Sequence, residues 1–234
     1  MKKLPILIVV ALITFSIGII AAAIWMTRQS PELIWGIGPS GPCHPLISQK
    51  ADTFKIGEEG YFPKGAFYGD EHTDQLMRSW YAKTLAQMKE SSLLDAPTNH
   101  ESAVYRFTWL RSFHSKIVVR IWTNGSVRNL SVKESSSENK KQNAQITVDQ
   151  SRSLTEDEWT AFARLLDEAC PWTLPSTQGT ALAMDGAWWV FEANSNGYYH
   201  VVARQSPERS YRDLGLYIVK LSGLPVDASK GEVY

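Results

Sequence analysis

Two histidines and two carboxylates, His114, Asp185, Glu192 and His200, lie in or beside segments that are otherwise rich in aromatic residues. Imidazole and carboxylate groups commonly act together in general acid–base catalysis, so a hydrolase could use one of these histidines as its base and one carboxylate as partner. The same residues have a structural interpretation, because Asp185-Gly186 is typical of a turn and a histidine at a strand end commonly satisfies a hydrogen bond. The pattern favours the structural interpretation.

Sequence motifs for nucleophilic or metal chemistry are missing. The chain contains no GxSxG, HExxH or P-loop motif, and neither a CxxC nor an HxxxH pair. These motifs place a nucleophile, two metal ligands or a phosphate cradle in a defined geometry. We therefore predict a non-catalytic protein with no cofactor and no metal, and keep the hydrolase as the alternative.

Four residues of the same segments are candidates for binding: Arg106, Arg111, Trp189 and Arg204. A two-residue turn at Asn196-Gly197 places Trp189 opposite Arg204, where a guanidinium can stack on an indole ring. Arginine and glutamate on neighbouring strands also pair across sheets, so a binding role competes with a structural one.

Charge excludes one class of partner. The 24 Lys and Arg residues balance the 24 Asp and Glu residues, which gives a formal net charge of zero. Affinity for nucleic acid depends on clustered positive charge that neutralises phosphates. We therefore predict that nucleic acid is not a partner.

An apolar segment near the N-terminus predicts a membrane span. From Leu4 to Met26 no residue carries a charge, and Lys2 and Lys3 precede the segment. A bilayer core needs about 20 helical residues, and positive charge favours the cytoplasmic side. We expect residues 4–26 to cross the inner (plasma) membrane, with the N-terminus cytoplasmic and the remaining chain periplasmic or extracellular.

A cleaved secretory signal is the competing interpretation of this segment. Ala21, Ala22 and Ala23 offer the small residues that a signal peptidase needs, with the cut after Ala23. The apolar run is longer than a typical signal core of about 7–15 residues and continues to Met26, which favours the uncut anchor. Either interpretation exports the rest of the chain.

Composition divides the chain into three parts. Residues 1–27 form the predicted anchor, and residues 28–66, rich in proline and glycine without a sustained hydrophobic period, indicate a stalk or strap. Residues 67–234 have the length and composition of a folded extracytoplasmic domain. Cys43 and Cys170, the two cysteines, can pair in an oxidising compartment or stay separate thiols, and their spacing does not decide between these.

Hydrophobic spacing predicts three helices in the domain. The first begins at Thr73 or Asp74. Its buried side is predicted to hold Leu76, Trp80, Leu85 and Met88, and its exposed side Gln75, Arg78, Lys83 and Lys89. The second begins with a capping box of Thr155 and Glu158, and the third follows Ser206-Pro207.

Two Asn-Gly pairs predict β-hairpins, at 124–125 and 196–197. A two-residue loop at the first pair sets Val119 opposite Leu130, and a polar run from Ser135 to Gln145 predicts an exposed loop before a short strand at 146–148. Hairpins rather than crossovers predict an α+β fold, with an antiparallel sheet built from hairpins and backed by about three helices, after an N-terminal transmembrane helix.

Several motifs together resemble an uncharacterised family of bacterial hypothetical proteins. They are YRFTWLRSFH at 105–114, LTEDEW at 154–159, DGAWWVFE at 185–192, YH at 199–200 and RQSP at 204–207. The resemblance covers about residues 103–224. It implies a shared architecture and no particular activity.

Two functional hypotheses follow. The first is a non-catalytic, membrane-anchored interaction domain of the bacterial envelope with an envelope protein as partner, of which an immunity protein against an exported toxin is a narrower form. The second is a hydrolase that uses His114 or His200 with Asp185 or Glu192.

Overall fold

The structure is a computed structural model, and it describes Cys43 and residues 49–50, 57, 59–94, 103–112, 114–136, 145–177 and 186–226, all within the unit Cys43–Tyr234. Its elements in chain order are β1 (Gln49–Lys50), α2 (Glu71–Gln87), β2 (Ala103–Arg111), β3 (Lys116–Asn124), β4 (Val127–Ser135), β5 (Ile146–Ser153), α3 (Glu156–Ala169), η2 (Pro171–Thr173), β6 (Ala187–Ser195), β7 (Tyr198–Arg204) and α4 (Arg209–Leu221).

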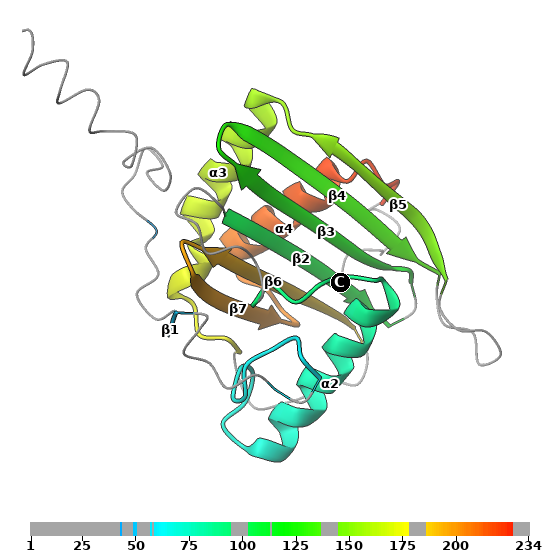
Figure 1. The fold of residues 1–234 in the computed structure, drawn as a ribbon, viewed down its shortest axis with the longest axis vertical. Coiled ribbons are helices and arrows are strands. Elements are labelled where there is room, and N and C mark those ends of the chain that lie inside the picture. The colour runs from blue at the N-terminus through cyan, green and yellow to red at the C-terminus, as the bar shows by residue number, and fades with distance from the viewer. Residues whose placement is uncertain are drawn as a thin grey trace, which may run out of the picture. The chain divides into compact units, whose positions relative to one another are not determined.

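A single antiparallel sheet organises these elements, with the strand order β1-β7-β6-β2-β3-β4-β5 (Figure 1). Strand β2 is central, because it pairs with β3, the next strand in the chain, and with β6, which follows much later. Helices α3 and α4 cover one side of the sheet and α2 covers part of the other. The predicted α+β fold with an antiparallel sheet and three helices is confirmed.

The side of the sheet under α3 and α4 is here called the apolar face. Strands β2 and β6 contribute Phe107, Trp109, Trp189 and Phe191, all nearly or fully buried. The ring centroid of Trp189 lies 5.1 Å from that of Trp109 and 5.7 Å from that of Phe107. Burial of one such side chain stabilises the fold by roughly 1.5–3 kcal/mol, so this face is the main hydrophobic core.

The opposite side, under α2 and residues 59–94, is called the charged face. Here Asp74 accepts hydrogen bonds from the backbone N–H groups of Gly65 (2.8 Å) and Phe67 (2.9 Å) and from Arg78 Nε (2.7 Å), while Arg78 also binds Glu59. Burial raises the pKa of Asp74, but the hydrogen bonds from Phe67 and Arg78 outweigh it, and the pKa lies below its ordinary value. The ionised Asp74 therefore fastens α2 to the segment before it.

The predicted orientation of α2 is confirmed toward its C-terminal end, where Leu85 and Met88 are buried, and is wrong in its first turns. Leu76 and Trp80 are 57% and 39% exposed, whereas Arg78 is only 2% exposed. Apolar spacing alone misassigned the buried side, because Asp74 and Glu59 supply the two carboxylates that allow Arg78 to be buried.

Part of the segment that was predicted as a stalk is packed on the domain. Phe62 is fully buried, and its ring lies against those of Phe67 and Tyr81, with centroids 5.1 and 6.2 Å away. Residues 59–66 therefore behave as a strap that belongs to the folded unit, which starts earlier than residue 67.

The described residues include no helix that is long and apolar enough to cross a membrane. The predicted span at residues 4–26 lies outside the part of the chain that the structure describes.

The hairpin β6–β7 has the predicted register. Trp189 lies opposite Arg204, and Asn196 and Gly197 form the turn with φ values of 53° and 77°. A positive φ at both central residues is typical of a type I′ turn, which Asn-Gly favours.

The hairpin β3–β4 differs from the prediction by one turn position. Gly125 and Ser126 form the loop, so Val119 pairs with Val132 rather than with Leu130. Gly125 has a φ of 60° at the first central position, as in a type II′ turn. The two turn residues are therefore Gly125 and Ser126, not the predicted Asn124 and Gly125. Each partner moves by two residues, so every side chain keeps its predicted face. Strand β5 runs to Ser153 and is longer than predicted.

Candidate functional site

A buried ion pair links β2 and β6 on the charged face. Arg106 and Glu192 are directly opposed in the sheet and both are 0% exposed. Arg106 Nε and Nη2 donate to the two carboxylate oxygens of Glu192 at 2.7 and 2.8 Å, and the Tyr199 hydroxyl donates to Glu192 Oε1 at 2.9 Å. The bidentate geometry orients both side chains.

A second carboxylate, Glu90, joins this pair from the segment that follows α2. Lys133 Nζ lies 2.7 Å from Glu90 Oε1, an ionic contact without the alignment of a hydrogen bond. Arg106 and Arg120 approach Glu90 Oε2 at 3.8 Å each. Three cations from three adjacent strands therefore surround one buried carboxylate.

Backbone carbonyls of the same segment are also bound by the sheet. Arg106 Nη1 donates to Ser91 O at 2.6 Å, and Asn194 Nδ2 donates to Leu93 O at 2.7 Å. The segment after α2 is thus docked on the charged face through side chains of β2 and β6 as well as through Glu90.

Burial sets the protonation chemistry of this cluster. It raises the pKa of Glu192, although the charge of Arg106 and its hydrogen bonds oppose the shift. It also raises the pKa of Tyr199 well above its ordinary value. A fully buried pair that is satisfied by its own chain positions the strands and does not contact a substrate.

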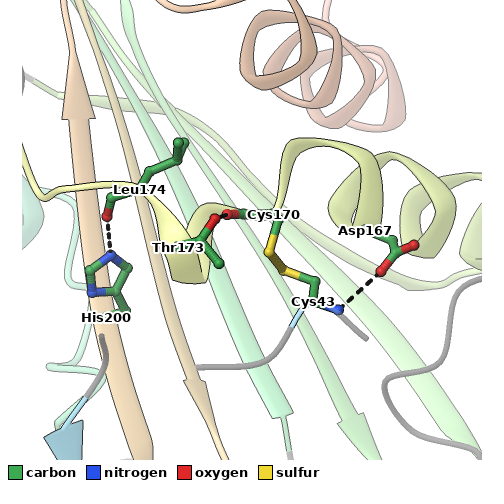
Figure 2. Close-up of a disulfide and its surroundings, with 6 residues drawn as sticks. All are labelled: Cys43, Asp167, Cys170, Thr173, Leu174 and His200. Atoms are coloured by element: carbon green, nitrogen blue, oxygen red, sulfur yellow. Dashed lines mark hydrogen bonds between the residues drawn. A yellow bond between two sulfur atoms is a disulfide. The ribbon is translucent and has the colours of Figure 1, made fainter. Parts of the chain in front are cut away.

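His200 and Glu192 are not a catalytic pair. His200 lies opposite Ala193 and Glu192 lies opposite Val201, so the two side chains project from opposite faces of the sheet. His200 Nε2 lies 2.8 Å from Leu174 O (Figure 2). The His200 ring also stacks on that of Trp172, with centroids 6.3 Å apart. Burial lowers the pKa of His200, which favours the neutral ring.

The two other acid–base candidates do not join Glu192. His114 is half-buried in the turn after β2, and the partner of Glu192 in β2 is Arg106, five positions before the end of that strand. An extended strand rises about 3.4 Å per residue, so about 17 Å of β2 separates Arg106 and its partner Glu192 from the end of the strand, where His114 follows. Asp185 lies outside the described residues.

The predicted binding residues contact their own chain. Arg111 donates to Ser115 O at 3.0 and 2.7 Å and lies over the Trp109 ring, 4.5 Å from its centroid. Arg204 donates to Pro175 O at 2.9 Å and Ala203 O at 2.9 Å. Together with the burial of Trp189 and Arg106, these contacts give all four residues a structural role.

Cys43 and Cys170 form a disulfide, which the sequence left open (Figure 2). Cys170 caps the C-terminal end of α3 in a left-handed conformation with a φ of 37°, and its Cα lies 5.3 Å from that of Cys43. Cys43 N also donates to Asp167 Oδ1 at 3.2 Å. The start of the folded unit is therefore fastened to α3 by a covalent bond and a hydrogen bond.

Sequence reasoning missed Glu90, Lys133 and Tyr199. The Arg106–Glu192 pair had a detectable signal, since both residues are charged within aromatic strands. Glu90 had none, because it follows a helix end where a solvent-exposed glutamate is common. Among the described residues, no three His, Cys, Asp or Glu side chains come together as a metal site.

No family model, no curated protein and no solved structure matches the chain. The resemblance to a bacterial family stays a prediction.

Proposed function

We propose that this protein is a non-catalytic interaction domain of the bacterial envelope, anchored in the inner membrane by residues 4–26 and exposed on its outer side. The apolar segment and the preceding Lys2 and Lys3 support the anchor and its orientation. The envelope partner is a protein, because the chain lacks the positive charge that nucleic acid requires.

The disulfide is the observation that carries the proposal. Disulfides persist in exported proteins and are rare in the reducing cytosol. Cys43 lies 16 positions after the end of the predicted anchor at residue 27, and Cys170 lies at the end of α3. The bond joins these two residues across a sequence separation of 127. Such a bond fits a domain that lies on the outer, oxidising side of the inner membrane.

The internal pairing of the polar residues supports a non-catalytic role. Arg106 and Glu192 neutralise each other in the core, and His200 packs on the other face of the sheet. Two of the four acid–base groups that motivated a hydrolase, Glu192 and His200, therefore have partners within the fold, which supports binding through the surface over catalysis.

Reporter fusions test the topology. Alkaline phosphatase fused after Tyr234 is active only where disulfides form, so we expect high activity with the full chain and low activity when residues 4–26 are deleted. A fluorescent protein that folds in the cytosol should give the reverse pattern. A full-chain fusion with an active cytosolic reporter and inactive phosphatase would refute the proposal.

Affinity capture tests the role. The intact protein, cross-linked in cells and purified from membranes, should reproducibly retain an envelope protein. If no protein is retained while the same preparation hydrolyses cell-wall or phosphate-ester substrates, the non-catalytic function is wrong.

A further inference from the structure

One edge of the sheet is covered and the other is open. At the covered edge β1 pairs with β7, and Ser176 O accepts a hydrogen bond from Ala203 N at 2.7 Å farther along β7. At the other edge, β5 is the last strand in the described part of the chain, and most of its residues are exposed. Figure 1 shows β5 along the outer side of β4.

The register shows which backbone groups of β5 point outward. Asn124 and Val127 are the hydrogen-bonded pair that closes the β3–β4 hairpin. The backbone groups of Val127 and of every second residue after it in β4 therefore bond to β3. The backbone groups of the residues between them, such as Val132, point toward β5. Gln150 is the partner of Val132 and therefore points toward β4. The backbone groups of Asp149, Ser151 and Ser153 consequently point away from the sheet.

Strand β5 has little of the usual protection of an edge beyond its first residues. The pairing with β4 shifts register opposite Glu134 and Ser135, but from Val148 to Ser153 it is regular. The strand sequence, ITVDQSRS, contains neither proline nor lysine, and its two charges cancel. Arg152 is held by its own chain, because it donates to Glu158 and to Leu221 O. An unprotected edge of this kind accepts another strand.

The strand is compatible with pairing to itself. A twofold axis normal to the sheet places residues of the same face opposite each other. If the axis passed through Asp149 or Arg152, that residue would lie opposite its own copy, and two like charges would meet. An axis at Gln150 sets Asp149 opposite Ser151 of the second copy, and an axis at Ser151 sets it opposite Ser153 of the second copy. Both registers also direct the outward backbone groups of one copy at those of the other.

We propose that β5 pairs antiparallel with β5 of a second copy of this chain, with the twofold axis at Gln150 or Ser151, so that one sheet runs through both copies. The interface is isologous and closed, so it produces a dimer and no filament. The inference goes beyond the proposed function and does not depend on the anchor.

Cysteine cross-linking of the full chain in membranes tests this pairing. Gln150→Cys and Ser151→Cys are made one at a time. The variant whose cysteine lies on the twofold axis brings two thiols together, because opposed Cα atoms there are about 4.5–5.5 Å apart. Oxidation should give a reducible band at twice the monomer mass of 26.3 kDa. The matched control is Gln75→Cys, an exposed glutamine on α2, which should stay monomeric.

A proline tests whether the backbone is responsible. The proline is placed at an outward residue of whichever cysteine chain cross-links, as Ser151→Pro with Gln150→Cys or as Ser153→Pro with Ser151→Cys. It removes an outward N–H and leaves the bonds to β4, so it should reduce the cross-linked fraction at least fivefold, whereas alanine at the same position should keep it. Cross-linking at Gln75→Cys equal to that at β5, or none at either β5 position, would overturn the proposal. A product of one copy with a different protein would overturn it too and assign the edge to that protein. If the proline variant fails to fold, the comparison of cross-linking at the β5 positions with cross-linking at Gln75→Cys still tests the proposal.

Discussion

On the apolar face, Trp109 and Trp189 pack with ring centroids 5.1 Å apart beneath α3 and α4. On the other face of the same two strands, Arg106 and Glu192 form a buried ion pair beneath the segment that follows α2. The strands therefore bury both faces. Both faces carry buried hydrocarbon, which on the charged face includes Leu110, Trp188 and Val190, but the charged face also buries this ion pair. The two faces stabilise the protein in different ways.

Hydrocarbon burial contributes free energy in proportion to area, whereas a buried ion pair repays its desolvation only when every hydrogen bond is made. The apolar face is thus stabilised by hydrocarbon burial alone, whereas the charged face combines hydrocarbon burial with the ion pair. The charged face fixes where the segment after α2 docks, because Ser91 O, Leu93 O and Glu90 must meet specific side chains.

The largest expected effect comes from breaking the ion pair on one side. Glu192→Ala leaves Arg106 buried without its partner and should lower the free energy of unfolding by about 3–5 kcal/mol. The measurement is a urea titration of the full chain followed by tryptophan fluorescence.

The matched control replaces both partners. The double variant Arg106→Met with Glu192→Leu fills the site with hydrocarbon and should be much more stable than either single variant, with a coupling energy of at least about 2 kcal/mol. Additive losses would show that the pair does not act as a unit, and the contrast between the faces would fail.

A smaller effect is expected where α4 approaches the sheet. A Cβ on Gly215 would lie 2.7 Å from the Trp189 ring, so Gly215→Ala should destabilise the fold by about 1–3 kcal/mol despite the better helix propensity of alanine. Thermal unfolding of the full chain measures it. Gly69→Ala is the control, because no atom lies within 4 Å of its Cβ position. Equal melting temperatures for the two variants would mean that the apolar face is loosely packed.

The same contrast explains how much of the fold could be predicted from sequence. The turn at Asn196-Gly197 and the capping box of Thr155 and Glu158 depend on residues within a few positions of each other, and both are confirmed. In α4, Leu214 and Ile218 are four positions apart and both are buried, so this helix also shows a local apolar spacing. Local signals suffice for the apolar face.

The charged face depends on distant partners. Arg78 is buried because Glu59 lies 19 positions earlier, and Arg106 because Glu192 lies 86 positions later. A hydrophobicity pattern assigns such residues to the surface, which is why Arg78 and the first turns of α2 were predicted wrongly, although Leu85 and Met88 are buried as predicted. The candidate site had the same limitation, since Glu192 and His200 are close in sequence but project from opposite faces.

A cap on the apolar side should have a smaller effect than either face. Thr155 Oγ1 accepts a hydrogen bond from Glu158 N, and Thr155→Ala removes it at the start of α3. We expect a loss of about 1 kcal/mol in the free energy of unfolding, measured by urea titration. Thr155→Ser retains the hydroxyl and should restore most of the stability. A loss as large as that of Glu192→Ala would mean that local capping, rather than tertiary burial, determines the stability of this side.

The smallest expected effect depends on pH. The hydrogen bonds from Arg152 lower the pKa of Glu158 to about 2, below its ordinary value of 4.5. A lowered pKa stabilises the fold at pH values above 4.5, and this contribution is lost as the pH falls from 4.5 to 2. Because the pair is partly exposed, Glu158→Gln should lower the free energy of unfolding by at most about 1 kcal/mol at pH 7. The difference in unfolding free energy between this variant and the parent chain should shrink as the pH falls from 4.5 to 2. Glu168→Gln, on the exposed side of the same helix, controls for the loss of a surface charge. If the difference in unfolding free energy between Glu158→Gln and the parent chain does not change with pH, the cap stabilises the helix through its geometry and not through the charge of Glu158.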